Sequence, residues 1–249
     1  MSRWRRGPMR TVLFFGLLLP GFSVTEASAG AQPACGGQPA TIAGTPGDDV
    51  ITGTSGNDVI AARGGTDVVR AGDGNDLVCA GTGDDTLRGE DGFDQMWASS
   101  DENDAGSLRG GTGNDLLRTA MSQARAYGGT GADTIDTREP GSSCTAHVVF
   151  GRGGADDLIG DSCSDRFHGG RGNDRIHGGR EGRQGPRVIG DQLYGGGGND
   201  NVFGESGNDF LYGGRGYDEL SGGRGRDECH SGEVVSSCTA VATARPPPG

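Results

Sequence analysis

A nine-residue period dominates this chain. Residues 44–97 divide without remainder into six nonads, GTPGDDVIT, GTSGNDVIA, ARGGTDVVR, AGDGNDLVC, AGTGDDTLR and GEDGFDQMW. In all six, glycine occupies position 4, aspartate position 6 and a large apolar residue position 8. A period of this kind is typical of stacked repeat proteins, in which each unit is stabilised by its neighbours.

The same frame extends to residue 230. Further nonads start at residues 110, 128, 151, 160 and 169, and four fill 195–230. The stretches 98–109, 119–127, 137–150 and 178–194 fit as one nonad each, with three, no, five and eight inserted residues. This gives 19 nonads, and every insertion falls on an odd-numbered one. Two nonads should form one turn of a solenoid, so that nonads n and n+2 stack on the same edge.

Each nonad should combine a turn with a short strand. Glycine-rich positions 1–5 permit a tight turn, and the aspartate at position 6 adds a carboxylate whose hard oxygens suit Ca²⁺. Positions 7–9 predict a three-residue strand whose position 8 points inward. The predicted core is Ile51, Ile60, Val69, Val78, Leu87, Met96, Leu117, Ile135, Leu158, Phe167, Ile176, Leu193, Val202, Leu211 and Leu220.

The charge balance requires an added source of stability. Glycine supplies 52 of 249 residues, and beyond residue 29 the chain has 33 acidic residues against 18 arginines. Such a chain is too polar and too self-repelling to collapse alone. Bound cations would supply what the narrow core lacks.

The nonads resemble the GGxGxDxUx calcium-binding repeat of the RTX, or hemolysin-type, family. The resemblance implies an all-β fold, a right-handed parallel β-roll of about 19 repeats. It also implies that several Ca²⁺ ions lie between stacked turns and use the aspartates of both.

The position-6 aspartates are therefore the predicted metal ligands, in two columns. The even column is Asp58, Asp76, Asp94, Asp115, Asp133, Asp156, Asp174, Asp200 and Asp218. The odd column is Asp49, Asp67 and Asp85, then, after a gap at nonads 7, 9 and 11, Asp165, Asp191, Asp209 and Asp227. Counting one ion between each neighbouring pair predicts up to about 13 Ca²⁺.

Six cysteines indicate disulfides in an oxidising compartment. Position in the frame suggests Cys35 with Cys79 at an N-terminal cap, Cys144 with Cys163 on neighbouring odd turns, and Cys229 with Cys238 at the C-terminal end. Free thiols and other pairings stay open, because sequence alone does not fix connectivity.

The ends of the chain predict export. Residues 1–29 have the arginines, apolar run and Ala-Ser-Ala pattern of a signal peptide, and the run is too short for a membrane span. We expect a secreted protein with an N-terminal cap at 30–43, the roll at 44–230, and a C-terminal cap and disordered tail at 231–249.

The expected role is calcium-dependent binding or surface scaffolding rather than catalysis. His-Glu-x-x-His and Gly-x-Ser-x-Gly are both absent, and Gly160-Asp161-Ser162 falls within a turn of the frame. The alternative is polysaccharide binding or modification by an outward ladder at position 9 of the odd nonads, which contains Tyr127, Phe150, His168, Tyr194 and Tyr212. An anionic cell-surface polymer is a further expected partner, and no nucleic acid is expected.

Overall fold

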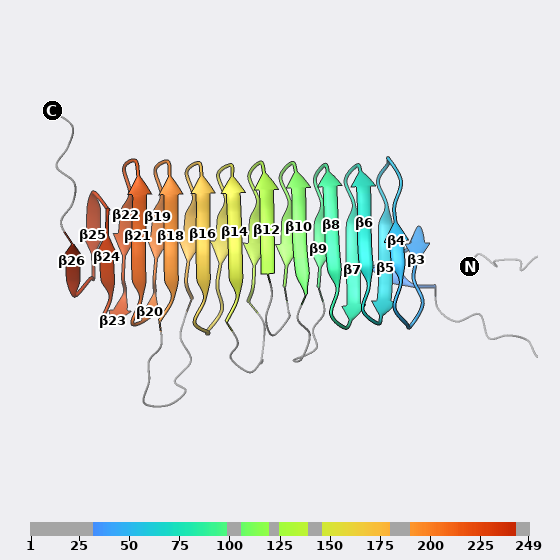
Figure 1. Ribbon diagram of the computed structural model, residues 1–249, viewed down its shortest axis with the longest axis horizontal. Helices are drawn as coiled ribbons and strands as arrows, with labels where there is room; N and C mark the ends of the chain where they lie inside the picture. The colour runs from blue at the N-terminus through green and yellow to red at the C-terminus, as the bar shows by residue number, and fades with distance from the viewer. Residues whose placement is uncertain (1–31, 99–105, 120–124, 139–145, 180–189, 243–249) are drawn as a thin grey trace, which may run out of the picture. The chain divides into compact units, whose positions relative to one another are not determined.

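The computed structural model of the chain describes residues 32–98, 106–119, 125–138, 146–179 and 190–242. All of these residues lie in the unit Gln32–Gly249. The predicted signal peptide, most of the insertions and the last seven residues lie outside the described residues. Within the described ranges, every regular element is a β-strand (Figure 1). The described part of the chain contains no helix of the length and apolarity that a membrane crossing requires.

Two parallel sheets form the roll, and each has 11 strands. We name them the odd sheet and the even sheet, after the nonads that supply their strands. In spatial order the odd sheet contains β4 (Val50–Thr52), β6 (Val68–Asp73), β8 (Thr86–Asp91), β10 (Ser107–Thr112), β12 (Arg125–Thr130), β14 (Val148–Gly153), β16 (Arg166–Arg171), β18 (Gln192–Gly197), β21 (Phe210–Arg215), β24 (Glu228–His230) and β26 (Ala240–Ala242).

The even sheet follows the same order along the solenoid. It contains β3 (Ile42–Ala43), β5 (Val59–Gly64), β7 (Leu77–Thr82), β9 (Gln95–Trp97), β11 (Leu116–Arg118), β13 (Thr134–Asp136), β15 (Asp157–Ile159), β17 (Arg175–His177), β19 (Asn201–Phe203), β22 (Glu219–Ser221) and β25 (Val234–Ser236). Outside these sheets, β1 (Ala34–Cys35) pairs antiparallel with β2 (Gln38–Pro39), and β20 (Ser206–Gly207) pairs parallel with β23 (Arg224–Gly225).

The register confirms the stacking of nonads n and n+2. Leu87 pairs with Leu108 and Leu108 with Ala126, although three inserted residues lie between the first two. Ala126 pairs with Val149 in the same way across the five-residue insertion. The insertions therefore leave the strand register intact.

The count of about 19 repeats is too low for the number of strands. Three further strands extend the sheets: β3 at the N-terminal end, and β25 and β26 at the C-terminal end. Their sequences lack the glycine and aspartate pattern that identifies a nonad. They can still add to the roll because edge pairing uses only main-chain N–H and C=O groups.

Many strands are also longer than the three residues predicted. From β6 to β21 the odd strands have six residues and continue into positions 1–3 of the next even nonad. In the even sheet β5 and β7 again have six residues, whereas β9, β11, β13, β15, β17, β19 and β22 have three and stop at position 9.

The core is a double column of position-8 side chains between the two sheets. All the predicted core residues are buried, and Leu108, Ala126, Val149 and Cys229 complete the column in the odd sheet. Position 1 adds the small buried side chains Ala62, Ala71 and Ala80. The core is thus continuous but only about one side chain deep on each sheet, which limits the stabilisation that apolar burial alone can provide.

Two disulfides fasten the ends of the roll, as predicted. Cys35 is bonded to Cys79, and Cys229 to Cys238. Gly36, beside the first bond, lies so close to Trp97 that a Cβ atom there would stand 2.7 Å from its ring. Cys163 is also disulfide-bonded, while its predicted partner Cys144 lies outside the described residues.

Candidate metal-binding sites

From nonad 3 onward, the turn of a regular nonad depends on two left-handed backbone positions. In nonad 8, φ is 132° at Gly111 and 119° at Gly113, which are positions 2 and 4. Glycine adopts such angles at little cost. Position 2 also accepts arginine, since φ is 89° at Arg63 and 82° at Arg152, and this places strain in those turns. The glycines therefore serve to permit the turn conformation, which arginine adopts at position 2 only with strain.

The position-6 aspartates form the two predicted columns, joined by hydrogen bonds between turns. The backbone N–H of Asp115 donates to Asp133 Oδ1 at 2.8 Å, and that of Asp133 donates to Asp156 Oδ1 at 2.9 Å. The even column is continuous in this way from Asp58 to Asp218. The odd column runs in two parts, Asp49 to Asp85 and Asp165 to Asp227.

The second oxygen of most of these carboxylates is buried without a hydrogen-bond partner. This holds for the Oδ2 atoms of Asp67, Asp76, Asp94, Asp115, Asp133, Asp156, Asp165, Asp174, Asp200, Asp209, Asp218 and Asp227. A buried, unpaired polar atom costs free energy, and a buried carboxylate costs more. A regular series of such atoms therefore points to ligands that the protein itself does not supply.

In the nonads that begin with glycine, a main-chain carbonyl oxygen converges with the Oδ2 atom. A Cβ atom at Gly110, which is position 1 of nonad 8, would clash with Asp115 Oδ2 and stand 2.6 Å from the carbonyl oxygen of Gly128. The same pairing of carboxylate and carbonyl oxygens occurs beside Gly89, Gly128, Gly151, Gly169, Gly195 and Gly204. Oxygen donors of these two kinds are those that Ca²⁺ binds, so the residues fit calcium.

The electrostatics of the columns agree with a need for cations. Burial raises the pKa of Asp94 and Asp133 to about 7, against the lowering effect of the backbone N–H groups that bond them. Burial likewise raises the pKa of Asp115 and Asp200 to about 6. Burial destabilises the ionised form of these carboxylates, and a bound divalent cation would stabilise it.

Asp49 and Asp58 differ from the later aspartates because threonines already donate hydrogen bonds to their Oδ2 atoms. The backbone N–H of Thr45 donates to Asp49 Oδ2 at 2.6 Å, and that of Thr54 to Asp58 Oδ2 at 2.7 Å. At Asp58 burial would raise the pKa, but bonds from Thr54 and from the Thr41 hydroxyl outweigh it and hold the pKa below its ordinary value. The N-terminal turns thus need a cation less than the later ones.

Two residues belong to the columns but were missed in the sequence analysis. At the C-terminal end, the backbone N–H of Asp218 donates to Glu233 Oε2 at 2.6 Å, so Glu233 continues the even column. In the odd column, the backbone N–H of His147 donates to Asp165 Oδ1 at 2.9 Å. His147 therefore occupies position 6 of nonad 11. Placing the five inserted residues at the start of that nonad would have revealed it.

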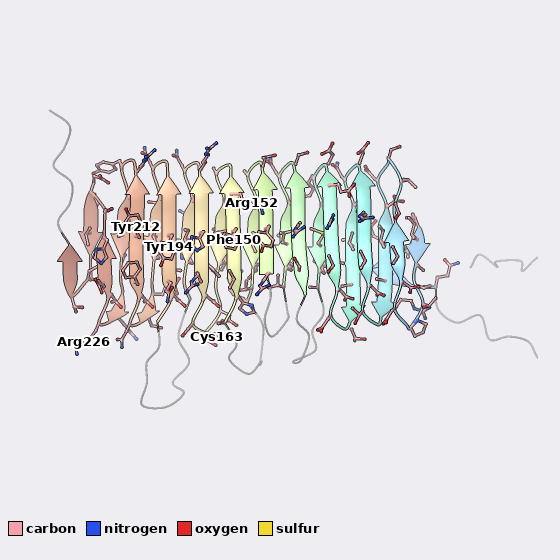
Figure 2. All side chains as sticks on the ribbon, in the orientation of Figure 1. Phe150, Arg152, Cys163, Tyr194, Tyr212 and Arg226 are labelled. Atoms are coloured by element: carbon pink, nitrogen blue, oxygen red, sulfur yellow. A yellow bond between two sulfur atoms is a disulfide. The ribbon has the colours of Figure 1, made fainter. Side chains whose placement is uncertain are left out.

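The predicted aromatic ladder is a stack of rings on the odd sheet (Figure 2). Ring centroids are 5.3 Å apart for Tyr127 and Phe150, 4.9 Å for Phe150 and His168, and 4.6 Å for His168 and Tyr194, with planes within 8° of parallel. The stack ends at Tyr212, whose ring is tilted 46° from that of Tyr194. Ring faces in the middle of the ladder are therefore covered by neighbouring rings.

Guanidinium groups cover the N-terminal end of the ladder. Arg109 and Arg152 lie 5.4 and 4.9 Å from the centroid of the Tyr127 ring. Both distances are within the range of cation–π attraction.

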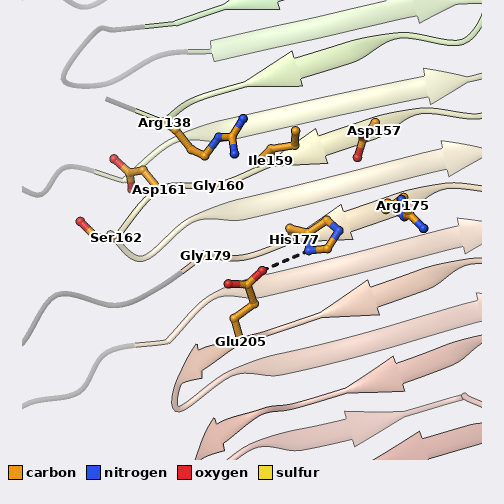
Figure 3. Close-up of a pocket in the computed structure, with 10 residues that line it drawn as sticks. All are labelled: Arg138, Asp157, Ile159, Gly160, Asp161, Ser162, Arg175, His177, Gly179 and Glu205. Carbon is orange, nitrogen blue, oxygen red and sulfur yellow. Dashed lines mark hydrogen bonds and ion pairs between the residues drawn. The ribbon is translucent and has the colours of Figure 1, made fainter. Parts of the chain in front are cut away.

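A cleft of about 550 Å³ opens on the even sheet near the interrupted part of the odd column (Figure 3). Its charged lining includes Arg138, Asp157, Arg175 and Glu205. Within it, His177 Nδ1 lies 3.1 Å from Glu205 Oε1. Asp161 and Ser162 also line the cleft, so it reaches the turn that precedes Asp165.

Comparison with protein families agrees with the frame of nonads. The model of the RTX calcium-binding nonapeptide repeat matches residues 43–78, 125–139, 148–181, 190–211 and 203–233, just over half of the chain. These matches include both aspartate columns on each side of the irregular middle region. No curated protein matches the chain.

Proposed function

Because this chain belongs to the RTX calcium-binding nonapeptide repeat family, we propose that it is an exported protein whose β-roll folds on binding a series of Ca²⁺ ions. In that state it serves as an extracellular binding or surface scaffold module. Ca²⁺ binding by the β-roll follows from the repeats themselves.

The observation that carries this proposal is the series of buried, unpartnered Oδ2 atoms. In the nonads that begin with glycine, this atom lies beside the carbonyl oxygen of the next stacked turn, so that one ion would contact two turns. A bound ion would neutralise the carboxylates and cross-link stacked turns, adding to the sheet hydrogen bonds, the N–H to Oδ1 bonds and the thin core that already join them. Calcium would thereby stabilise the folded state by mass action, by about 1.4 kcal/mol per ion at a tenfold excess over its dissociation constant.

A calcium titration of the full chain tests the proposal. The protein should lack β-structure in EDTA and gain it cooperatively at millimolar Ca²⁺, as followed by circular dichroism. Equal Mg²⁺ is the matched control and should not substitute, because Mg²⁺ demands stricter octahedral geometry and keeps its water. Isothermal titration should find on the order of 13 ions, the number of neighbouring aspartate pairs. A stoichiometry of three or four would contradict the arrangement in two columns.

The disulfides support the exported part of the proposal. All cysteines that the structure describes are disulfide-bonded, and such bonds persist in oxidising compartments. Extracellular calcium is also in the millimolar range that weak oxygen sites of extracellular modules require. Fractionation of cells that express the full chain would test export, with removal of residues 1–29 as the expected change.

A non-catalytic role is also part of the proposal, and the histidine contacts support it. His168 is stacked between Phe150 and Tyr194. His177 Nδ1 and His230 Nε2 lie beside Glu205 and Glu228, at 3.1 and 2.6 Å. His168 and His177 thus contact side chains of neighbouring turns, and His230 contacts a side chain of its own strand β24.

Polysaccharide binding remains the alternative, and one observation favours it at the C-terminal end of the ladder. Tyr212 is 40% exposed, and its tilt leaves its ring less covered than the parallel rings before it. Retention on polysaccharide resins in calcium should fall in a Tyr194→Ala and Tyr212→Ala double variant. A Tyr127→Ala variant is the matched control, since guanidinium groups already cover that ring. Unchanged retention in the double variant would remove this alternative.

A further inference from the structure

An imidazole stands where the odd column would require a carboxylate. The backbone N–H of His147 bonds to Asp165 Oδ1 at 2.9 Å, just as that of Asp165 bonds to Asp191 Oδ1 at 2.7 Å. The two backbones are therefore in equivalent positions, but the side chains are not. Ca²⁺ binds oxygen ligands, whereas imidazole nitrogen suits zinc and its neighbours among the transition metals.

Two carboxylates lie beside this imidazole. One nitrogen of His147 and one carboxylate oxygen from each of Asp161 and Asp165 lie within 4.8 Å of one another. His147 Nε2 and Asp161 Oδ2 are 3.7 Å apart, and their side chains are 3% and 7% exposed. This separation exceeds a hydrogen bond. It is close to the roughly 3.3 Å that tetrahedral geometry sets between two ligands about 2.0–2.1 Å from a zinc ion.

Hydrogen bonds on the opposite oxygens orient both carboxylates. The backbone N–H of Cys163 donates to Asp161 Oδ1 at 2.7 Å, and that of His147 donates to Asp165 Oδ1. Asp165 is 2% exposed, and its Oδ2 atom has no hydrogen-bond partner. Supporting bonds of this kind fix the direction of metal ligands. Cys163 Sγ is also near, but it is in a disulfide and supplies no thiolate.

We propose that His147, Asp161 and Asp165 bind one divalent transition-metal ion of the zinc class at the point where the odd calcium column is interrupted. Water completes the coordination, and Asp161 connects the site to the cleft of Figure 3, which gives the ion a path from solvent. Asp165 also begins the second part of the odd column. The site rests on the proposed calcium-dependent fold, but neither the His147 imidazole nor the Asp161 carboxylate is one of the proposed calcium ligands.

The test uses untagged full-length protein, folded in millimolar Ca²⁺ and titrated with Zn²⁺ against a chromophoric chelator. One equivalent of Zn²⁺ should bind with calcium still present. His147→Ala should weaken zinc binding by at least about 100-fold, since even the loss of an outer-shell partner costs 10–100-fold. Asp161→Asn is a second variant that leaves both calcium columns intact. Co²⁺ in place of Zn²⁺ should give the visible absorption of a nitrogen and oxygen site in the parent protein but not in His147→Ala.

His177→Ala is the matched control, because this histidine lies in the neighbouring cleft but outside the cluster. It should bind zinc like the parent. The site is overturned if the calcium-folded parent binds no zinc, or if zinc binding survives both His147→Ala and Asp161→Asn. Failure of the parent to fold in calcium would instead contradict the proposed function, so the two failures are distinguishable.

Discussion

The backbone N–H of Asp115 donates a 2.8 Å hydrogen bond to Asp133 Oδ1, across two turns that are 18 residues apart. The other oxygen of Asp133 is buried without a partner. One carboxylate thus fastens the preceding turn through Oδ1 and offers Oδ2 as a ligand. Along both columns, the aspartates repeat this arrangement, with one carboxylate oxygen joining adjacent turns and the other available to a cation.

Replacing Asp133 should therefore weaken calcium-dependent folding more than replacing Asp58. Asp133→Asn keeps an oxygen for the Asp115 N–H but removes the charge that calcium neutralises. We expect the free energy of unfolding in calcium to fall by about 1.4 kcal/mol or more, the linkage value for one ion at a tenfold excess over its dissociation constant. In Asp58→Asn the loss should be smaller, since Thr54 and Thr41 already bond this carboxylate. Equal shifts in urea midpoints would contradict this ranking.

The calcium-free fold should lose stability as the pH rises. Burial raises the pKa of Asp94, Asp133 and Asp209 from 3.8 to about 7, despite backbone hydrogen bonds that lower it. Between pH 4 and 7 the folded state therefore holds protons that the unfolded state has released. The stabilisation from these protons is full below this window and is lost progressively as the pH rises through it. After removal of calcium by dialysis, circular dichroism should show more β-structure at pH 4.5 than at pH 8. The opposite order would exclude burial as the dominant influence on these carboxyls.

Alanine should be tolerated in place of Gly153 but not in place of Gly151, although both lie in the same turn. A Cβ atom at Gly151 would clash with Asp156 Oδ2 and stand 2.7 Å from the Gly169 carbonyl oxygen, whereas at Gly153 its nearest neighbour would be 3.8 Å away. Gly151→Ala should lower stability by about 1–3 kcal/mol, the usual cost of overpacking, and weaken calcium binding. Gly153→Ala in the same turn is the control and should leave both within error.

Loss of the N-terminal disulfide should cost more than loss of the C-terminal one. Cys35 and Cys79 are 44 residues apart in sequence, while Cys229 and Cys238 are 9 apart. The loop-entropy relation gives about 4.0 kcal/mol for the longer loop and about 2.6 kcal/mol for the shorter. Double serine variants compared by urea unfolding in calcium should show this order. A larger loss for the shorter loop would mean that native contacts of the C-terminal end outweigh chain entropy.

Much of the fold could be predicted because the period links local and global structure. An aspartate at position 6 and an apolar residue at position 8 fix which groups face the turn and which face the core, and a constant repeat length fixes the register. The irregular nonads were harder, since an insertion can be placed at several points within them. Leu108, Ala126 and Val149 follow their insertions or degenerate turns, and only their pairing with neighbouring strands assigns them to the core.

By itself the sequence determined the β-roll, its two aspartate columns and the fit of those columns to calcium, because these depend on side-chain period alone. Only the tertiary structure decided which strands end the roll and which residues lie where the odd aspartate column is interrupted. Strands β3 and β25 pair through main-chain groups that carry no sequence pattern. His147 and Asp161 meet because stacking brings together two odd turns that β14, an even turn and β15 separate in the sequence. Contacts of that kind depend on distances between turns, which a one-dimensional repeat does not contain.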